Sequence, residues 1–184
     1  MSTRFVLLDR DGTINEEVDH LDRPDQVTLI PGAAAALRHL RSAGLGLVIL
    51  TNQANVGRGL LPPDRLKEIH AHLLDLLAVE GVQVDDLYVC PHAPEDGCEC
   101  RKPKAGLALR AAMDHGFRPA DAFVVGDHAA DMGLGRAIGA ITILVRTGHG
   151  EEELAAGAQA DHVVADLPEA TGVILDIVSS VARR

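Results

Sequence analysis

Short apolar segments alternate with longer segments of helical spacing along most of the chain, and this alternation strongly limits its fold. Five runs have the character of buried strands. Strands separated by helices pair in parallel, because the chain must cross back over a face of the sheet before the next strand begins. We therefore predict a three-layer, Rossmann-like α/β fold, a parallel sheet with helices on both faces. The apolar runs are residues 5–8, 45–50, 87–89, 122–125 and 141–145.

The segments between the apolar runs begin and end at residues typical of helix ends. Two of them begin at proline-containing pairs, residues 31–32 and 63–64, and they end at Gly44 and Gly81. The tail at residues 167–183 is expected to form a last helix that packs outside. Since 184 residues is close to the size of one domain, we expect a single domain over the whole chain.

Charge and hydropathy argue against several classes of partner. The formal net charge of -10 repels polyanions, so we expect no nucleic-acid partner. The N-terminus lacks a signal-peptide core, and no run of about 18 apolar residues could cross a membrane. We therefore expect a cytoplasmic protein without a membrane partner. Without coiled-coil heptads or a long apolar patch, a monomer is expected.

Two carboxylates follow the first apolar run, at Asp9 and Asp11. Side chains alternate along an extended chain, so both carboxylates project to the same side where the strand ends. Ligands of open parallel sheets bind outside the carboxyl ends of the strands, and Gly12 permits a turn whose N–H groups can face an anion. This position favours a functional pair over the alternative, a solvated turn with two exposed acids.

Polar residues also follow other apolar runs. Thr51-Asn52-Gln53 ends the second run, and Gly126-Asp127 ends the fourth, with Asp131 close behind. Carboxylate oxygens gathered at one edge of a sheet are ligands that Mg²⁺ prefers. Arg101-Lys102 adds positive charge that complements phosphate. The sequence therefore predicts a site for magnesium and a phosphate group at this edge.

All three cysteines fall within eleven residues, together with one histidine: Cys90, His92, Cys98 and Cys100. Three thiolates and one imidazole saturate tetrahedral Zn²⁺ and leave no position open for catalysis, so the zinc would be structural. It would fasten the irregular loop 90–104 and direct the cations that follow the last cysteine toward the site. The alternative is buried cysteines with an incidental histidine, because the spacing within each ligand pair is tighter than in common zinc fingers.

These motifs, in this order, resemble the haloacid dehalogenase-like phosphatase superfamily over nearly the whole chain. The closer resemblance is to its heptose-bisphosphate phosphatase branch, which also holds histidinol phosphatases. One departure is His128, since the relatives usually carry lysine directly after the metal-binding aspartate. The motifs of this branch are Asp9-Arg10-Asp11-Gly12-Thr13-Ile14-Asn15, Thr51-Asn52-Gln53, Cys90-Pro91-His92 and Cys98-Glu99-Cys100-Arg101-Lys102-Pro103.

The resemblance implies a magnesium-dependent phosphomonoester hydrolase. Asp9 would attack phosphorus to form an aspartyl phosphate, and Asp11 would act first as general acid and then as general base. Magnesium held by Asp9, the backbone carbonyl of Asp11 and Asp127 would neutralise charge during the transfer. Thr51 and Lys102 would hold the phosphoryl oxygens.

The resemblance also implies how the substrate is reached. The 39 residues between Asp11 and Thr51, and the 50 between Thr51 and Lys102, are filled by the predicted elements, so we expect a capless, open site. Arg101 is expected to recognise the substrate, and Asp131 to orient Lys102 or the waters of the metal. Further substrate contacts are expected from Arg10, Glu17, Val18, Asp19, His20, Asn52, Gln53, Ala54, Arg58 and His128.

Within this branch the expected substrate is D-glycero-D-manno-heptose 1,7-bisphosphate, which would lose its 7-phosphate on the way to nucleotide-activated heptose. The alternative is histidinol phosphate, whose amine Glu17 or Asp19 could face. A phosphoacceptor signalling domain also gathers aspartates and a lysine at strand ends. Such a domain needs no acid placed like Asp11, which makes it the more distant alternative.

Overall fold

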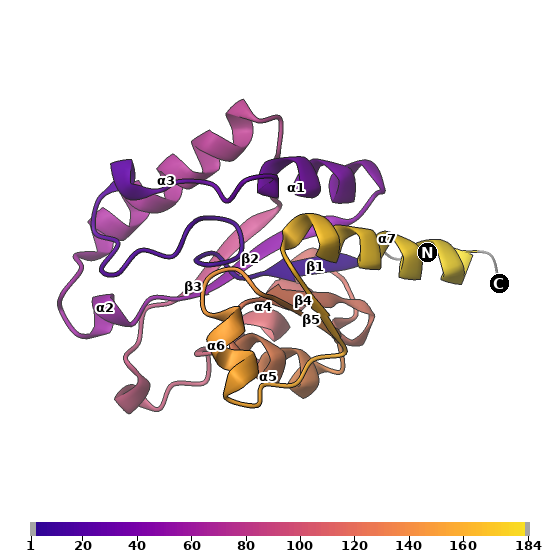
Figure 1. Cartoon of the computed structure of the whole chain (residues 1–184). Coiled ribbons are helices and arrows are strands. Elements are labelled where there is room, and N and C mark those ends of the chain that lie inside the picture. Colours follow the sequence, from indigo (N-terminus) through magenta and orange to yellow (C-terminus); the bar gives the residue numbers. More distant parts are fainter. Residues whose placement is uncertain (1–2, 183–184) are drawn as a thin grey trace.

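The computed structural model describes residues 3–182, and its centre is a six-stranded, fully parallel sheet with strand order β3-β2-β1-β4-β5-β6 (Figure 1). The predicted parallel sheet is confirmed, and each of the five apolar runs lies within or overlaps one of its strands. The strands are β1 (Phe5–Leu8), β2 (Gly46–Asn52), β3 (Asp86–Cys90), β4 (Phe123–Gly126), β5 (Ile141–Val145) and β6 (His162–Val164).

Helices connect the strands as the parallel pairing requires. Helix α3 begins at Pro63, whose fixed φ suits the first turn of a helix. Helices α4 and α5 end at Gly116 and Gly139, which have φ values of 68° and 73° that other residues rarely adopt. The helices are α1 (Ala33–Ser42), α2 (Ala54–Gly57), α3 (Pro63–Val79), α4 (Gly106–His115), α5 (Ala129–Ile138), α6 (Gly150–Ala155) and α7 (Leu167–Ala182), with short 3-10 helices at Pro24–Gln26, Pro94–Asp96 and Pro119–Asp121.

Two hydrophobic cores lie on opposite faces of the sheet. Alternate residues of β1 belong to different cores, with Leu8 in one and Leu7 in the other. The first core includes side chains of α1, α3 and α7, and the second includes side chains of α4 and α5, so the two groups of helices form separate outer layers (Figure 1). Because both faces are covered, the strands read as continuous apolar runs rather than as alternating ones.

Strand β6 was not predicted from the sequence. It is only three residues long, and its first two residues are not buried, so it lacks the apolar run that marked the other strands. Asp161 fixes its start, because its Oδ2 accepts the backbone N–H of Thr142 at 2.8 Å and the Thr142 hydroxyl at 2.7 Å. The predicted tail helix corresponds to α7, and residue 183 lies outside the described residues.

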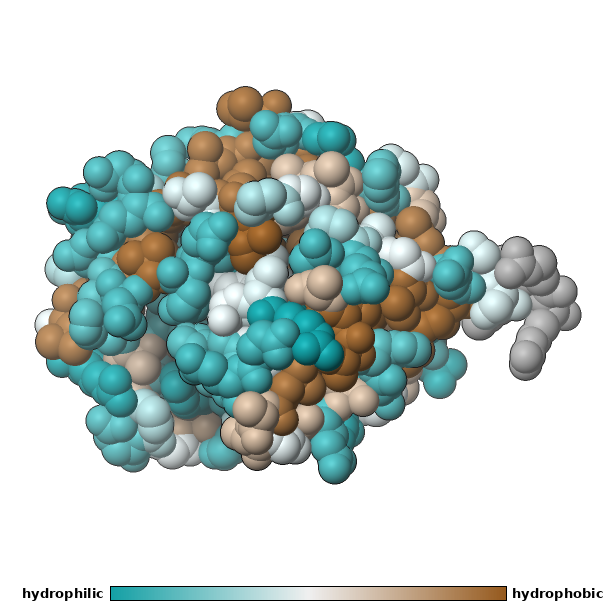
Figure 2. Space-filling view, in the orientation of Figure 1, coloured by the Kyte–Doolittle hydropathy of each residue, from teal (hydrophilic) through white to brown (hydrophobic). Residues whose placement is uncertain are grey.

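The surface visible in Figure 2 is mostly hydrophilic, with a band of hydrophobic residues beside α7. No helix in the described part of the chain combines the length and the apolar character needed to span a bilayer.

We expect the substitution Leu37→Ala to lower the free energy of unfolding by about 2–5 kcal/mol, because Leu37 in α1 is fully buried in the first core and its removal leaves a cavity. The matched control is Leu109→Ala in α4, where the side chain is 51% exposed; a change within about 0.5 kcal/mol is expected there. Urea unfolding followed by circular dichroism measures both. Equal losses in the two variants would contradict this assignment of the core.

Candidate active site

The two aspartates after β1 stand at the carboxyl edge of the sheet, where the chain turns sharply at Gly12. Gly12 has φ 69°, and a Cβ atom there would lie 2.2 Å from Oδ2 of Asp127. The glycine therefore permits both the turn and the close approach of this loop to the end of β4. As a result, the carboxylates that follow β1 and β4 lie side by side.

Lys102 is the cation at the centre of the site. Its side chain is 2% exposed, and Nζ lies 2.8 Å from the carbonyl oxygen of Leu50, 2.8 Å from Oδ1 of Asp9 and 2.6 Å from Oδ1 of Asp131. Burial alone would lower the pKa of Lys102, but the two carboxylates raise it above its usual range. The lysine is therefore a fixed positive charge that links β2, the loop after β1 and helix α5.

Burial raises the pKa values of all three clustered carboxylates, Asp9, Asp127 and Asp131. Burial raises the pKa of Asp9 to about 7; the Asp131 carboxylate adds to the rise and Lys102 opposes it. Burial, followed by the charge of Asp9, raises the pKa of Asp127 to about 6. These groups repel one another as anions, so a bound cation would stabilise their charged forms.

The oxygens at this edge suit a divalent cation. Asp9, Asp127 and Asp131 each offer one carboxylate oxygen, and these atoms all lie within 4.8 Å of one another. Oδ2 of Asp127 accepts the backbone N–H of His149 at 2.8 Å, whereas Oδ1 is buried and has no hydrogen-bond partner among the described residues. A buried acceptor of this kind, beside other hard oxygen ligands, fits Mg²⁺.

Asp11 is held as a carboxylate by four donated hydrogen bonds. Arg10 donates two of them, from Nε at 3.0 Å and from Nη2 at 2.6 Å. Asn15 and Gln53 donate the others, at 2.9 and 3.0 Å. Burial would raise the pKa of Asp11, but the Arg10 guanidinium holds it below its usual range. Asp11 is therefore ionised in this arrangement and can accept a proton.

A cavity of about 240 Å³ opens above these groups and is lined mainly by polar side chains. It collects the aspartates, the two cations Arg101 and Lys102 of the loop 90–104, and Thr51 and Asn52 at the end of β2. A second hollow of about 280 Å³ shares Asp11, Glu17 and Asn52 with it and adds Arg10, Val18, Asp19, His20, Leu21, Gln53, Ala54 and Asn55. The cavity of about 240 Å³ is lined by Asp9, Asp11, Glu17, Thr51, Asn52, Arg101, Lys102, Asp127, His128, Ala130, Asp131 and His149.

The remaining residues expected to contact substrate lie in varied positions. The Arg10 side chain is buried beneath Asp11, and the residue is 1% exposed. Arg58 is exposed directly after α2 and lines neither hollow. His128 is exposed at the cavity, where its Nδ1 pairs with Glu153. Asn52 binds the backbone of Lys102 in both directions, at 3.1 and 3.2 Å, and so also fixes the position of that lysine.

The loop after β5 contributes residues that the sequence analysis did not include. The Thr147 hydroxyl donates to the Gly12 carbonyl at 2.5 Å, and His149 both donates its N–H to Asp127 and lines the cavity. The position of β5 could have indicated these residues: it ends at the same edge of the sheet as β1 and β4, so the loop that follows it reaches the site. Asn15 was within the quoted motif but was given no role, although its amide binds Asp11.

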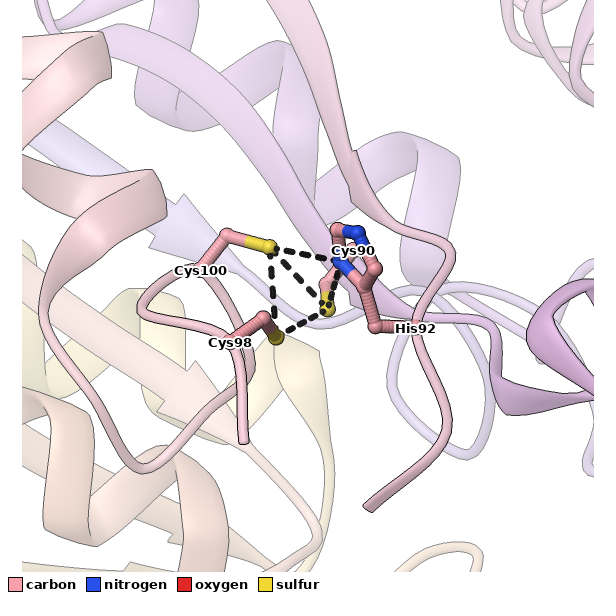
Figure 3. A group of neighbouring side chains, drawn as sticks. All are labelled: Cys90, His92, Cys98 and Cys100. Carbon is pink, nitrogen blue, oxygen red and sulfur yellow. Dashed lines mark hydrogen bonds between the residues drawn. The ribbon is translucent and has the colours of Figure 1, made fainter. Parts of the chain in front are cut away.

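The three cysteines and His92 converge as the sequence predicts (Figure 3). The Sγ atoms lie 3.2 to 3.6 Å apart, and His92 Nδ1 lies 3.2 Å from Cys100 Sγ and 3.7 Å from Cys90 Sγ. These sulfur separations are too long for a disulfide, and they approach the value of about 3.8 Å between two sulfurs on a tetrahedral zinc. The cluster could therefore hold a structural zinc ion.

The cluster is joined to the site through its own loop. Arg101 Nη1 donates to the carbonyl oxygen of His92 at 3.3 Å, and Lys104 Nζ donates to the carbonyl of Cys98 at 2.8 Å. Since Arg101 and Lys102 directly follow the last cysteine, the cluster restrains both cations at the cavity.

We expect the purified protein to contain about one equivalent of zinc per chain, measured by mass spectrometry of the metal. Cys100→Ser should lose most of this zinc, because one of four ligands is replaced by a poorer one. Glu95→Gln, a change at an exposed residue of the same loop, should retain it. Wild-type protein that contains no zinc after expression with added zinc would contradict this interpretation.

The comparisons with known proteins agree with this geometry. A family model described as HAD-hydrolase-like matches residues 99–170. A curated D-glycero-beta-D-manno-heptose-1,7-bisphosphate 7-phosphatase of Pseudomonas putida is 35% identical over 98% of this chain and 98% of its own length. The enzyme of the same name from Haemophilus influenzae is 37% identical over 90% of this chain and 95% of its own length.

A solved structure is similar over almost the same span. It is the crystal structure of the D,D-heptose 1,7-bisphosphate phosphatase of Bordetella bronchiseptica in complex with magnesium and phosphate. The TM-score is 0.89 at 34% identity, and the match covers 95% of this chain and 99% of that chain. With relatives above 30% identity that match almost from end to end, the chain belongs to the D-glycero-D-manno-heptose-1,7-bisphosphate 7-phosphatase family of HAD-like hydrolases.

Proposed function

We propose that this protein removes the 7-phosphate of D-glycero-D-manno-heptose 1,7-bisphosphate by way of an aspartyl phosphate on Asp9. The observation that carries the proposal is the arrangement at one edge of the sheet. Asp9 contacts the buried Lys102 and belongs to a cluster of carboxylate oxygens that suits magnesium, and Asp11 lines the same cavity. The names of the relatives supply the substrate.

In the first step, Asp9 is the nucleophile. Its Oδ1 accepts the backbone N–H of Arg10 at 2.7 Å and contacts Lys102, while its Oδ2 has no hydrogen bond among the described residues. Oδ2 is therefore the oxygen available for attack on phosphorus. The new bond from this oxygen to phosphorus forms as the bond to the departing sugar oxygen breaks, which divides a difficult hydrolysis into two easier steps.

Asp11 moves the proton in both steps. The approach of an anionic phosphate raises the pKa of a neighbouring carboxylate, so a substrate bound here favours the protonated form of Asp11. That proton goes to the leaving alkoxide. The resulting carboxylate, stabilised by Arg10, Asn15 and Gln53, then takes a proton from the water that attacks the aspartyl phosphate.

Magnesium would be held by Asp9, the backbone carbonyl of Asp11 and Asp127. When bound, it supplies positive charge that offsets the charge of the transferring phosphoryl group. Thr51 and Lys102 hold the phosphoryl oxygens. Lys102 Nζ already contacts three oxygens, so a phosphoryl oxygen would replace one of these contacts, and Asp131 keeps the ammonium group in position.

The body of the sugar occupies the second hollow. Glu17 and Asn52 line both hollows and are placed to contact substrate on either side of the phosphate. Arg101 and His128 line the first cavity, where they can contact the substrate close to the transferring phosphoryl group. Arg10 is proposed to act through Asp11. Substrate-contacting roles remain proposed for Arg10, Glu17, Val18, Asp19, His20, Asn52, Gln53, Ala54, Arg58, Arg101 and His128.

We further propose a single-domain, monomeric enzyme that acts in the cytoplasm. Support comes from the sheet that both groups of helices cover, and from the thiol cluster, which requires a reducing compartment to stay reduced. The net charge of -10 disfavours a nucleic-acid partner.

We expect Asp9→Asn to lower kcat with heptose bisphosphate by about a thousandfold or more, because an amide cannot form the covalent intermediate. The protein should remain folded by circular dichroism. Asp22→Asn, at an exposed aspartate of the following loop, is the matched control and should retain wild-type kcat. Substantial turnover by Asp9→Asn would exclude Asp9 as the nucleophile.

We expect heptose 1,7-bisphosphate to exceed histidinol phosphate in kcat/KM by about a hundredfold or more, which corresponds to about 2.7 kcal/mol of transition-state discrimination. Phosphate release is measured with both anomers at matched concentrations. Chelation of magnesium should abolish the activity and added magnesium should restore it. A preference for histidinol phosphate would overturn the substrate, although it would leave the reaction class intact.

A further inference from the structure

Arg10 is the most deeply buried cation beneath the cavity, and its guanidinium has a partner on each side. Two of its nitrogens face the Asp11 carboxylate, in a forked arrangement that fixes both groups in one plane. The third, Nη1, lies 2.8 Å from Nε2 of His70. Since Arg10 is 1% exposed and His70 is 9% exposed, water reaches this contact poorly.

His70 belongs to helix α3, on the face that the helix turns toward the first core. Leu66, Ile69 and Leu73 of the same face are buried there, so the ring is held by the packing of the helix. A guanidinium only donates hydrogen bonds, so Nε2 must accept in this contact and the ring proton must lie on Nδ1. Burial and the neighbouring Arg10 charge lower the pKa of His70 to about 4, which keeps the ring neutral near pH 7.

We infer that His70 is a positioning residue for the reaction: by accepting from Arg10, it fixes the plane of the guanidinium that holds Asp11. This inference rests on the proposed function, in which Asp11 is the general acid and base. Without an acceptor at position 70, Nη1 would lose a buried partner, and the guanidinium could rotate toward other acceptors. Asp11 would then lose the geometry that proton transfer needs.

The test compares His70→Leu with His70→Gln. Leucine has no acceptor, whereas the Oε1 atom of glutamine can reach a position similar to that of Nε2. We expect His70→Leu to lower kcat/KM for heptose bisphosphate by about tenfold or more, a part of the 10²- to 10⁴-fold that general acid catalysis supplies. His70→Gln should recover most of that loss. His72→Leu, on the same helix, is the matched control and should change kcat/KM little.

A second substrate separates positioning of the acid from general damage to the fold. p-Nitrophenyl phosphate has a leaving group that needs no proton, and kcat/KM reports on the steps up to its departure. His70→Leu should therefore lower kcat/KM for p-nitrophenyl phosphate by less than about threefold. Equal losses on both substrates, or a glutamine variant no better than the leucine variant, would overturn the inference.

The contact can also be measured without turnover. Long-range proton–nitrogen NMR spectra of the wild-type protein should show His70 with its proton on Nδ1 and a bare Nε2. A proton on Nε2 would refute the contact even if both variants were inactive or poorly folded. If the wild-type protein hydrolyses no phosphate ester while the expected tautomer is found, the proposed function fails and the Arg10–His70 contact stands.

Discussion

The ammonium group of Lys102 is the charge on which the arrangement of the site depends. Asp9, Asp127 and Asp131 are brought within a few ångströms of one another by the ends of β1 and β4 and the start of α5. Buried acids this close would otherwise repel one another or take up protons. Lys102 contacts Asp9, Asp131 and the carbonyl of Leu50, so a single side chain joins three segments far apart in the sequence.

The fold could be predicted largely because its strands are buried on both faces and read as apolar runs. The same property located the site, since parallel strands carry their polar continuations to one edge. Strand β6 could not be predicted in this way because it is short, its first two residues are not buried, and it is fixed by the Asp161 side chain rather than by an apolar pattern. Its existence depends on tertiary contacts that local sequence does not record.

Within the site, the prediction was strongest where chemistry restricts the residue type and weakest where contacts depend on packing. Four metal-ligating side chains in one loop can be identified from their chemistry alone, and they do converge. Arg10 was expected to contact substrate; it lines the second hollow, but its guanidinium is buried between Asp11 and His70 of helix α3, a packing contact that the sequence did not indicate. The loop after β5 has no distinctive chemistry, and only its place in the sheet brings Thr147 and His149 to the cavity.

The two layers of helices support different parts of the site. His70 of helix α3, in the first layer, contacts Arg10. The loop 90–104 carries Lys102 and leads into α4, in the second layer. The sheet separates the two supports. The acid–base pair and the phosphate-binding cation therefore depend on different packing: a substitution in α3 reaches Asp11 through Arg10, whereas a substitution in the loop 90–104 acts directly on the position of Lys102.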